Sequence, residues 1–173
     1  MKKFVFVILI FCFSLTVISC SDEKEEFTAT PKASPTSWTK QLGSSSDDYA
    51  NGIVTDSSGS VYISGTTYGG LDGNTSAGNA DLFVVKYNSS GTKQWTKQLG
   101  TSSTDTANGV ATDSSGNVYV AGGTYGGLDG NTSADDNDLF VVKYNSSGTK
   151  QWTKQLGSSS RDSARELPPK PSK

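Results

Sequence analysis

The sequence predicts an all-β protein built from tandem four-stranded antiparallel units, and three observations carry this prediction. The segment Trp-Thr-Lys-Gln-Leu-Gly begins at Trp38, Trp95 and Trp152, which gives a period of 57 residues. Residues 38–94 and 95–151 are identical at 45 of 57 aligned positions, so one structural unit has been duplicated. Within the unit, runs of strand length alternate with Gly/Ser/Asn turn clusters, and no long stretch has helical periodicity.

The first half of the unit predicts a tight hairpin. An apolar and β-branched run at residues 52–55 is followed by Asp-Ser-Ser-Gly at 56–59. Asp bonds to nearby backbone and Gly accepts a positive φ, so this segment predicts a turn. The second strand, at residues 61–67, alternates apolar and polar side chains between its two faces.

The second half of the unit begins with a long, glycine-rich connection at residues 68–80, which is not a strand. The third strand, at 82–87, is apolar on both faces until Lys86, the pattern of a strand buried from both sides. Asn-Ser-Ser-Gly at 88–91 predicts a second tight turn, and the fourth strand at 93–99 has the mixed polarity of an outer, partly exposed strand.

Two tight hairpins and one longer connection make a four-stranded meander, which is typical of a β-propeller blade. The segments at 61–65, 81–87 and 95–100 resemble the bacterial beta-propeller repeat called SBBP, and the similarity extends over residues 38–157. The resemblance implies a seven-bladed type of propeller in secreted or surface proteins, usually with many more repeats and no assigned catalytic residues. A β-solenoid or an irregular β-sandwich array is the alternative.

The N-terminus predicts a secretory signal, with two lysines before a largely apolar run at residues 4–18 that is short for a membrane span. Val-Ile-Ser-Cys at 17–20 resembles the lipobox of bacterial lipoproteins. The resemblance implies cleavage before Cys20 and its acylation by palmitate-type chains; an ordinary signal peptide with a chance cysteine is the alternative. We therefore assign residues 1–19 to a lipoprotein signal peptide and 20–37 to the lipidated cysteine and a flexible tether.

The residue after Cys20, the charge balance and the lack of histidine restrict the location and the possible functions of the protein. Ser21 after the cysteine resembles the outer-membrane default, which implies lipid anchoring in a bacterial outer membrane with the surface or periplasmic orientation open. Loss of Lys2 and Lys3 leaves 13 basic against 17 acidic residues without a basic cluster, so no nucleic-acid partner is expected. The chain has no histidine, and Cys12 leaves with the signal, which excludes histidine-dependent catalysis and thiolate metal sites. We therefore expect a protein that is not an enzyme and has no cofactor.

The longer connections predict the binding surface. In a propeller, residues 44–50 and 68–80, with their copies 101–107 and 125–137, should emerge on one rim, opposite the tight hairpins. Loops on a rigid scaffold carry most binding residues, so this loop-rich rim is the expected binding surface. The candidate residues there are Asp47, Tyr49, Tyr68, Asp72, Tyr125 and Asp129.

Carboxylates in these connections suggest two further sites. Oxygen-only ligands suit calcium, although the spacing matches no EF-hand and solvated turn residues are the alternative. The calcium candidates are Asp129, Asp135, Asp136 and Asp138. Asp48, Asp105 and Asp162 recur in the other connection, where they either fix turns through their own backbone or line a channel as paired acids.

The repeat pattern leaves the array open. A spare outer strand is expected at residues 38–43 with no partner in this chain, and residues 158–173 are expected to form a divergent, disordered tail. Residues 165–169 can be encoded by codons that, when read in a frame shifted by two nucleotides, specify the residues expected at this point of the repeat. This match suggests that a frameshift truncated a longer gene. Open blade faces favour self-association.

The expected function is a lipid-anchored interaction module for an unknown protein or glycan. The alternatives are a carboxylate-based carbohydrate-active enzyme and an inactive truncated remnant.

Overall fold

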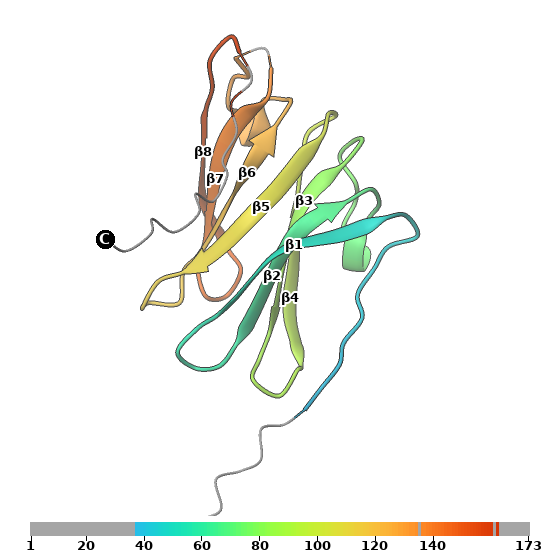
Figure 1. Cartoon of the computed structure of the whole chain (residues 1–173), viewed down its shortest axis with the longest axis vertical. Coiled ribbons are helices and arrows are strands. Elements are labelled where there is room, and N and C mark those ends of the chain that lie inside the picture. Colours follow the sequence, from blue (N-terminus) through green and yellow to red (C-terminus); the bar gives the residue numbers. More distant parts are fainter. Residues whose placement is uncertain (1–36, 135, 161, 163–173) are drawn as a thin grey trace, which may run out of the picture. The chain divides into compact units, whose positions relative to one another are not determined.

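The computed structural model describes residues 37–134, 136–160 and 162 (Figure 1). Their strands form two four-stranded antiparallel sheets, each in sequential order. Blade 1 contains β1 (Asp48–Thr55), β2 (Val61–Thr67), β3 (Asp81–Tyr87) and β4 (Lys93–Leu99). Blade 2 contains β5 (Asp105–Thr112), β6 (Val118–Thr124), β7 (Asp138–Tyr144) and β8 (Lys150–Leu156). A short 3-10 turn lies between the second and third strands of each blade: η1 (Leu71–Gly73) and η2 (Leu128–Gly130). The prediction of an all-β fold made of four-stranded meanders is confirmed.

The predicted hairpin turns are present. The Asp56 Oδ1 atom accepts the amides of Ser58 at 3.0 Å and Ser60 at 2.9 Å, and Gly59 has a φ of +78°. Asn88 fixes the second hairpin in the same way, because its Oδ1 accepts the amide of Thr92 at 2.8 Å. Both turns therefore arise from a side chain that satisfies nearby amides and a glycine that takes a left-handed conformation.

The first strand begins earlier than its sequence indicated. Residues 48–50 were expected in a loop, but they pair with residues 65–67 of β2 beyond a β-bulge between Ala50 and Gly52. The side chain of Asn51, the extra residue of the bulge, donates to the carbonyl of Ala107 in blade 2 at 2.8 Å. Apolar alternation is interrupted at a bulge, and the sequence pattern therefore could not detect this extension.

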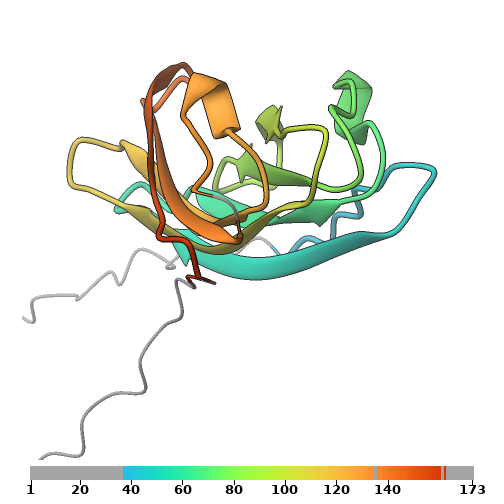
Figure 2. The same ribbon diagram turned by 90° about the horizontal axis from the view of Figure 1, so that it is seen from above.

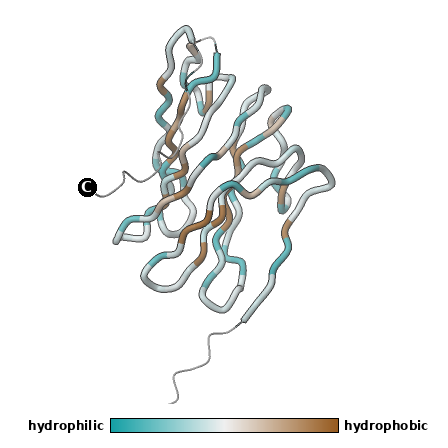
Figure 3. The backbone as a smooth tube through the Cα atoms, viewed as in Figure 1, coloured by the Kyte–Doolittle hydropathy of each residue, from teal (hydrophilic) through white to brown (hydrophobic). Residues whose placement is uncertain are grey.

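An apolar core joins the two blades and involves mainly β2 and β3 of blade 1 with β6 and β7 of blade 2. The ribbons of the two blades lie side by side, with β1 next to β5 (Figure 2). Its buried members are Tyr62, Leu82, Val84, Ala107, Val118, Val120, Leu128, Phe140, Val142 and Tyr144. The apolar segments lie in the strands, and the connections are mostly hydrophilic (Figure 3). β3 is buried from both faces, as predicted, whereas β7, with the same sequence, alternates between buried and half-buried residues. Burial of this strand therefore depends on a neighbour on each side.

The segment at 38–43 is not a strand, which corrects the expectation of a spare outer strand. It forms no ladder, yet Trp38 and Leu42 pack against a second apolar cluster of Leu71, Phe83, Val85 and Tyr87. As expected, the segment therefore pairs with no strand among the described residues, but its side chains pack on blade 1. The expected signal peptide, Cys20 and nearly all of the expected tail lie outside the described residues. Within the described ranges, no helix has the length and apolar character needed to cross a membrane.

Candidate functional site

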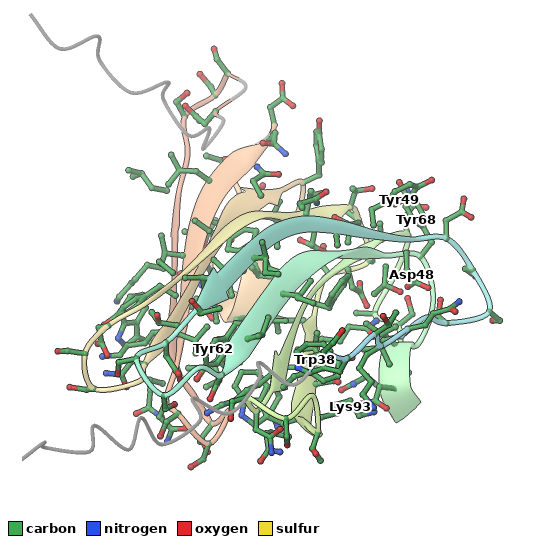
Figure 4. The ribbon with its side chains drawn as sticks, turned by 60° about the horizontal axis from the view of Figure 1, so that its bottom comes forward. Trp38, Asp48, Tyr49, Tyr62, Tyr68 and Lys93 are labelled. Carbon is green, nitrogen blue, oxygen red and sulfur yellow. The ribbon has the colours of Figure 1, made fainter. Side chains whose placement is uncertain are left out.

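Three of the candidate rim residues come together in blade 1. Tyr49 at the start of β1 and Tyr68 just after β2 form an edge-to-face pair, with ring centroids 6.2 Å apart at 80° (Figure 4). The amide of Tyr68 donates to the carbonyl of Asp47 at 3.0 Å, and the Tyr49 hydroxyl donates weakly to Asp47 Oδ2 at 3.4 Å. The side chains are open to solvent, since Tyr49 and Tyr68 are 53% and 46% exposed. We call Asp47, Tyr49 and Tyr68 the rim patch.

The negative charge of Asp47 acts directly on this patch. It raises the pKa of Tyr49 above its ordinary value, with smaller contributions from desolvation and from the hydrogen bond to Asp47. The Tyr49 phenol therefore remains neutral at physiological pH. The patch consequently offers two aromatic surfaces and a carboxylate without a competing positive charge among its three members.

Asp48 holds the preceding connection in place. Its Oδ2 accepts the amide of Ser44 at 2.6 Å. Burial raises the pKa of Asp48, but hydrogen bonds from Thr67 and Ser44 outweigh it and lower the pKa overall. Asp105 and Asp162 make the equivalent backbone bonds, at 2.6 Å each. All three carboxylates thus fix turns, as the first of their two interpretations predicted.

Asp72 takes a different position from the rim patch. Its carboxylate pairs with Lys93 at the start of β4, and that hydrogen bond is the main cause of its lowered pKa. In blade 2, Asp129 pairs in the same way with Lys150. Asp72 and Asp129 have φ values of +55° and +56°, so η1 and η2 turn sharply to bring them to the outer strands. These two candidates are therefore engaged in structural ion pairs.

Tyr125 is the equivalent of Tyr68 and is 44% exposed. The residue that would pair with it is Thr106, where blade 1 has Tyr49, and Thr104 stands in place of Asp47. Blade 2 therefore retains one aromatic side chain but no aromatic pair and no adjacent carboxylate. The rim patch belongs to blade 1 alone among the described residues.

The described calcium candidates interact with other groups of the protein itself. Asp136 Oδ1 accepts the amide of Asn137 at 2.8 Å. Asp138 is buried and its Oδ2 accepts from the Ala134 amide at 2.9 Å and the Gln155 side chain at 2.7 Å. Asp135 lies outside the described residues. In the described part of the chain, no three acidic, histidine or cysteine side chains are grouped to hold a metal, and calcium binding stays an untested prediction.

Sequence reasoning missed the role of the glutamine in the repeated Trp-Thr-Lys-Gln-Leu-Gly segment. Gln98 on β4 accepts the amide of Leu71 at 2.8 Å and donates to the carbonyl of Gly69 at 3.0 Å. It therefore fastens the long connection to the outer strand, and Gln155 does the same in blade 2. The recurrence of this glutamine in all three copies was the available signal.

A cavity lies between the N-terminal segment and blade 1. Its volume is about 270 Å³, and Trp38, Leu42, Leu71, Phe83 and Tyr87 contribute apolar side chains to its lining. Tyr49 reaches it from the rim patch. The sequence did not predict this cavity, because it depends on how residues 38–42 lie across the blade.

Two meandering sheets that pack face to face and repeat at a fixed sequence interval define a repeat protein of the β-propeller class. The family model SBBP, described as "Beta-propeller repeat", matches residues 37–72 and 94–129. The chain therefore carries two SBBP beta-propeller repeats. Each match begins just before a Trp-Thr-Lys-Gln-Leu-Gly segment and ends within the 3-10 turn of the following blade.

A curated relative shares part of this sequence. The chain is 34% identical over 130 residues to the regulatory protein FlaEY of Caulobacter vibrioides. The alignment covers 66% of this chain and 13% of that protein. The chain therefore spans about an eighth of the length of the curated relative, and the similarity concerns one segment of it.

Proposed function

We propose that this protein is an interaction module, held outside the cytoplasm by a lipid on Cys20, that binds a protein partner through the rim patch. The observation that carries this proposal is the exposed edge-to-face pair of Tyr49 and Tyr68 beside the carboxylate of Asp47. Exposed aromatic side chains with a polar atom at one end are common at binding surfaces. SBBP repeats and the similarity to a segment of a regulatory protein support a module that acts by binding.

The chemistry of the patch favours a partner with exposed arginine or lysine. A cation over a tyrosine ring gains about 0.5–1 kcal/mol at an exposed site, and a neighbouring carboxylate adds a charge-assisted hydrogen bond. The chain itself has a net charge of −2, so long-range attraction also favours a basic surface. The lipid anchor and the tether would present the patch at the membrane.

The proposal is tested with three probes on the detergent-extracted lipoprotein: a short Arg-rich peptide, a Glu-rich peptide of equal length and a neutral oligosaccharide. We expect the Arg-rich peptide to bind in isothermal titration calorimetry. Tyr49→Thr and Asp47→Thr, which introduce the residues of blade 2, should each weaken that binding about twofold to fivefold.

Tyr125→Thr is the matched control, because Tyr125 is equally exposed but has no ring partner of this kind in blade 2. It should leave the affinity unchanged. Equal binding by all variants would contradict the proposal. Binding of the oligosaccharide that is lost in Tyr49→Thr would replace the protein partner by a glycan.

A further inference from the structure

Each blade has two apolar faces, and the chain packs one face of blade 1 on the opposite face of blade 2. We call the face of a blade that receives the preceding blade its leading face. The leading face consists of Ile63, Leu71, Phe83, Val85 and Tyr87 in blade 1, and of Val120, Leu128, Phe140, Val142 and Tyr144 in blade 2. We call the opposite face, which contacts the next blade, its trailing face. The trailing face consists of Tyr62, Leu82, Val84, Trp95 and Leu99 in blade 1, and of the equivalent Tyr119, Leu139, Val141, Trp152 and Leu156 in blade 2. Contact of a trailing face with a leading face therefore holds neighbouring blades together.

The trailing face of blade 2 is uncovered by the described residues. Trp152 and Leu156 are 38% and 69% exposed, and Leu139 and Val141 are half-buried although their equivalents in blade 1 are fully buried. The five residues of this face are identical to those of blade 1. Blade 2 therefore presents the same surface that blade 1 uses to bind a neighbour.

This exposed face already has the geometry of the packed one. Trp152 and Tyr119 lie with ring centroids 6.2 Å apart at 57°, and the equivalent pair in blade 1, Trp95 and Tyr62, lies at 6.0 Å and 57°. Lys143 stands over the Tyr119 ring at 5.2 Å. A surface that needs no rearrangement loses little conformational entropy on binding.

The leading face of blade 1 is covered by residues 38–42, which we call the N-terminal plug. The indole Nε1 of Trp38 donates to the Ser89 carbonyl at 3.3 Å, and its ring lies 5.7 Å from that of Tyr87 at 33°. Trp95 makes the equivalent contacts with blade 2: its Nε1 donates to the Ser146 carbonyl at 3.3 Å, and its ring lies 6.4 Å from Tyr144 at 32°. The plug thus occupies the position of a preceding blade's outer strand.

We propose that the trailing face of blade 2 docks on the leading face of blade 1 of a second copy of this chain, with Trp152 displacing Trp38 of that copy. The Trp152 indole would then donate to the Ser89 carbonyl of the second copy. The plug is consequently an autoinhibitory contact, because Trp38 and Trp152 compete for one position. The occupant is a second copy because the chain already contains this interface once, made of equivalent residues that are mostly identical.

Two of the residues that differ between the two interfaces favour the docking, whereas Ala111 in place of Val54 removes apolar contact. On the leading face, blade 1 has Ile63 at the position that Val120 has in blade 2. Ile63 is larger by one methylene and lines the cavity of about 270 Å³ between the plug and blade 1. On the trailing face, blade 2 has Ala121 at the position that Ser64 has in blade 1. The buried hydroxyl of Ser64 has no hydrogen-bond partner. An unsatisfied buried hydroxyl is costly, so the interface between copies lacks one penalty that the interface within the chain carries.

The polar contact at the edge of the interface is also repeated. Lys86 Nζ donates to the Ser146 carbonyl at 3.3 Å across the two blades, and Lys86 stands over the Tyr62 ring at 5.1 Å. Lys143 has the same position over Tyr119 and would reach Ser89 of the second copy. Because the two joined surfaces differ from each other, the association is head-to-tail and grows by addition until a ring closes.

Sedimentation velocity of residues 21–173, which lack Cys20 and therefore its lipid, over a range of concentrations tests this inference. Trp38→Ala should strengthen association about tenfold, because it removes the competitor but keeps the docking face. Trp152→Ala should weaken association by a similar factor. Opposite effects of two tryptophans that each begin a Trp-Thr-Lys-Gln-Leu-Gly segment are expected only if they compete for one site.

Two further measurements keep the inference falsifiable if a tryptophan variant folds poorly. Leu156→Asp changes a side chain that is 69% exposed and should abolish the association of Trp38→Ala without changing its circular dichroism. A peptide of the plug sequence should inhibit the association of Trp38→Ala. The inference is overturned if Trp38→Ala associates no more strongly than the parent chain, or if Leu156→Asp leaves the association of Trp38→Ala intact. Of the rim patch, Tyr49 lines the cavity beside the plug, so the peptide titrations of the proposed function are made on Leu156→Asp, whose unaltered rim patch lets the two proposals fail independently.

Discussion

The Nε1 atom of Trp95 donates to the carbonyl oxygen of Ser146 at 3.3 Å and thereby joins the outer strand of blade 1 to the last hairpin of blade 2. The same indole packs between Tyr62 of its own blade and Tyr144 of the next. Trp95 is therefore the residue through which the two blades contact each other along their outer edge. We expect Trp95→Ala to lower the free energy of unfolding by about 1.5–3 kcal/mol, the value of one large apolar side chain.

Trp152→Ala is the control for this prediction, because Trp152 has the same local sequence but no following blade among the described residues. It should cost less than Trp95→Ala, because it removes the contact with Tyr119 in its own blade but no ring contact between blades. Urea unfolding at a protein concentration too low for association measures both variants. Equal losses in the two variants would show that Trp95 acts within its own blade only.

Gly148 lies against the Trp95 indole, and its substitution should loosen the contact between the blades. An added Cβ would approach Trp95 Cδ2 to 2.8 Å, and the residue has a φ of +78°. Gly130→Ala has the same φ with no atom within 4 Å of its Cβ, so it measures the left-handed backbone cost by itself. We expect Gly148→Ala to cost about 1–3 kcal/mol more than Gly130→Ala in thermal or urea unfolding, because it also overpacks the interface. A difference near zero would contradict the close packing of Trp95 on this turn.

Acid should weaken the first hairpin of each blade. Burial raises the pKa of Asp56, but hydrogen bonds from Ser58, Ser60 and Tyr62 overcome this and lower it from 3.8 to about 2. A carboxyl with a lowered pKa in the folded state stabilises the protein above the unfolded value, and this contribution is lost as pH falls from about 4 toward 2. The melting temperature should therefore decrease over that range.

Asp56→Asn isolates this effect, because Asn88 shows that an amide can fix the same type of turn. The variant should fold at neutral pH and have a smaller decrease in melting temperature between pH 4 and pH 2. Circular dichroism melts at several pH values provide the measurement. An unchanged pH dependence would assign the acid sensitivity to other carboxylates.

Building the rim patch into blade 2 should create a second binding site. Thr104→Asp together with Thr106→Tyr would place a carboxylate and a ring beside Tyr125, which already has the position of Tyr68. We expect the titration with the Arg-rich peptide to double in stoichiometry, with similar affinity at both sites. Thr104→Ala together with Thr106→Ala is the control. An unchanged stoichiometry for the Thr104→Asp, Thr106→Tyr variant would show that the blade 1 patch depends on more than its three side chains.

Lipid anchoring is tested through Cys20. The mature protein should begin at Cys20, have a mass above that of its polypeptide by the attached acyl chains, and incorporate labelled palmitate during growth. Cys20→Ser should abolish the label, and Ser21→Ala should retain it. A mature N-terminus at another residue, without added mass, would identify an ordinary secretory signal.

Most of the strand arrangement could be predicted because it depends on local chemistry. Asp56 and Asn88 cap turns that end in glycine, and the apolar runs between them have strand length. The exception was the start of β1, where the bulge at Asn51 interrupts the alternation that reveals a strand. The rim patch could be predicted as a list of loop residues, but the sequence could not separate Tyr49 and Tyr68, which meet, from Asp72, which pairs with Lys93.

The sequence by itself determined the period, the all-β blade and the turn chemistry, since each depends on residues that are close along the chain. Only the tertiary structure decided which surfaces are covered. Phe83 and Phe140 have the same neighbours in sequence, yet Phe140 is buried by blade 1 and Phe83 by the N-terminal plug. Likewise, Trp95 is packed and Trp152 is exposed. Burial depends on what lies across a face, and no repeat unit encodes its own neighbour.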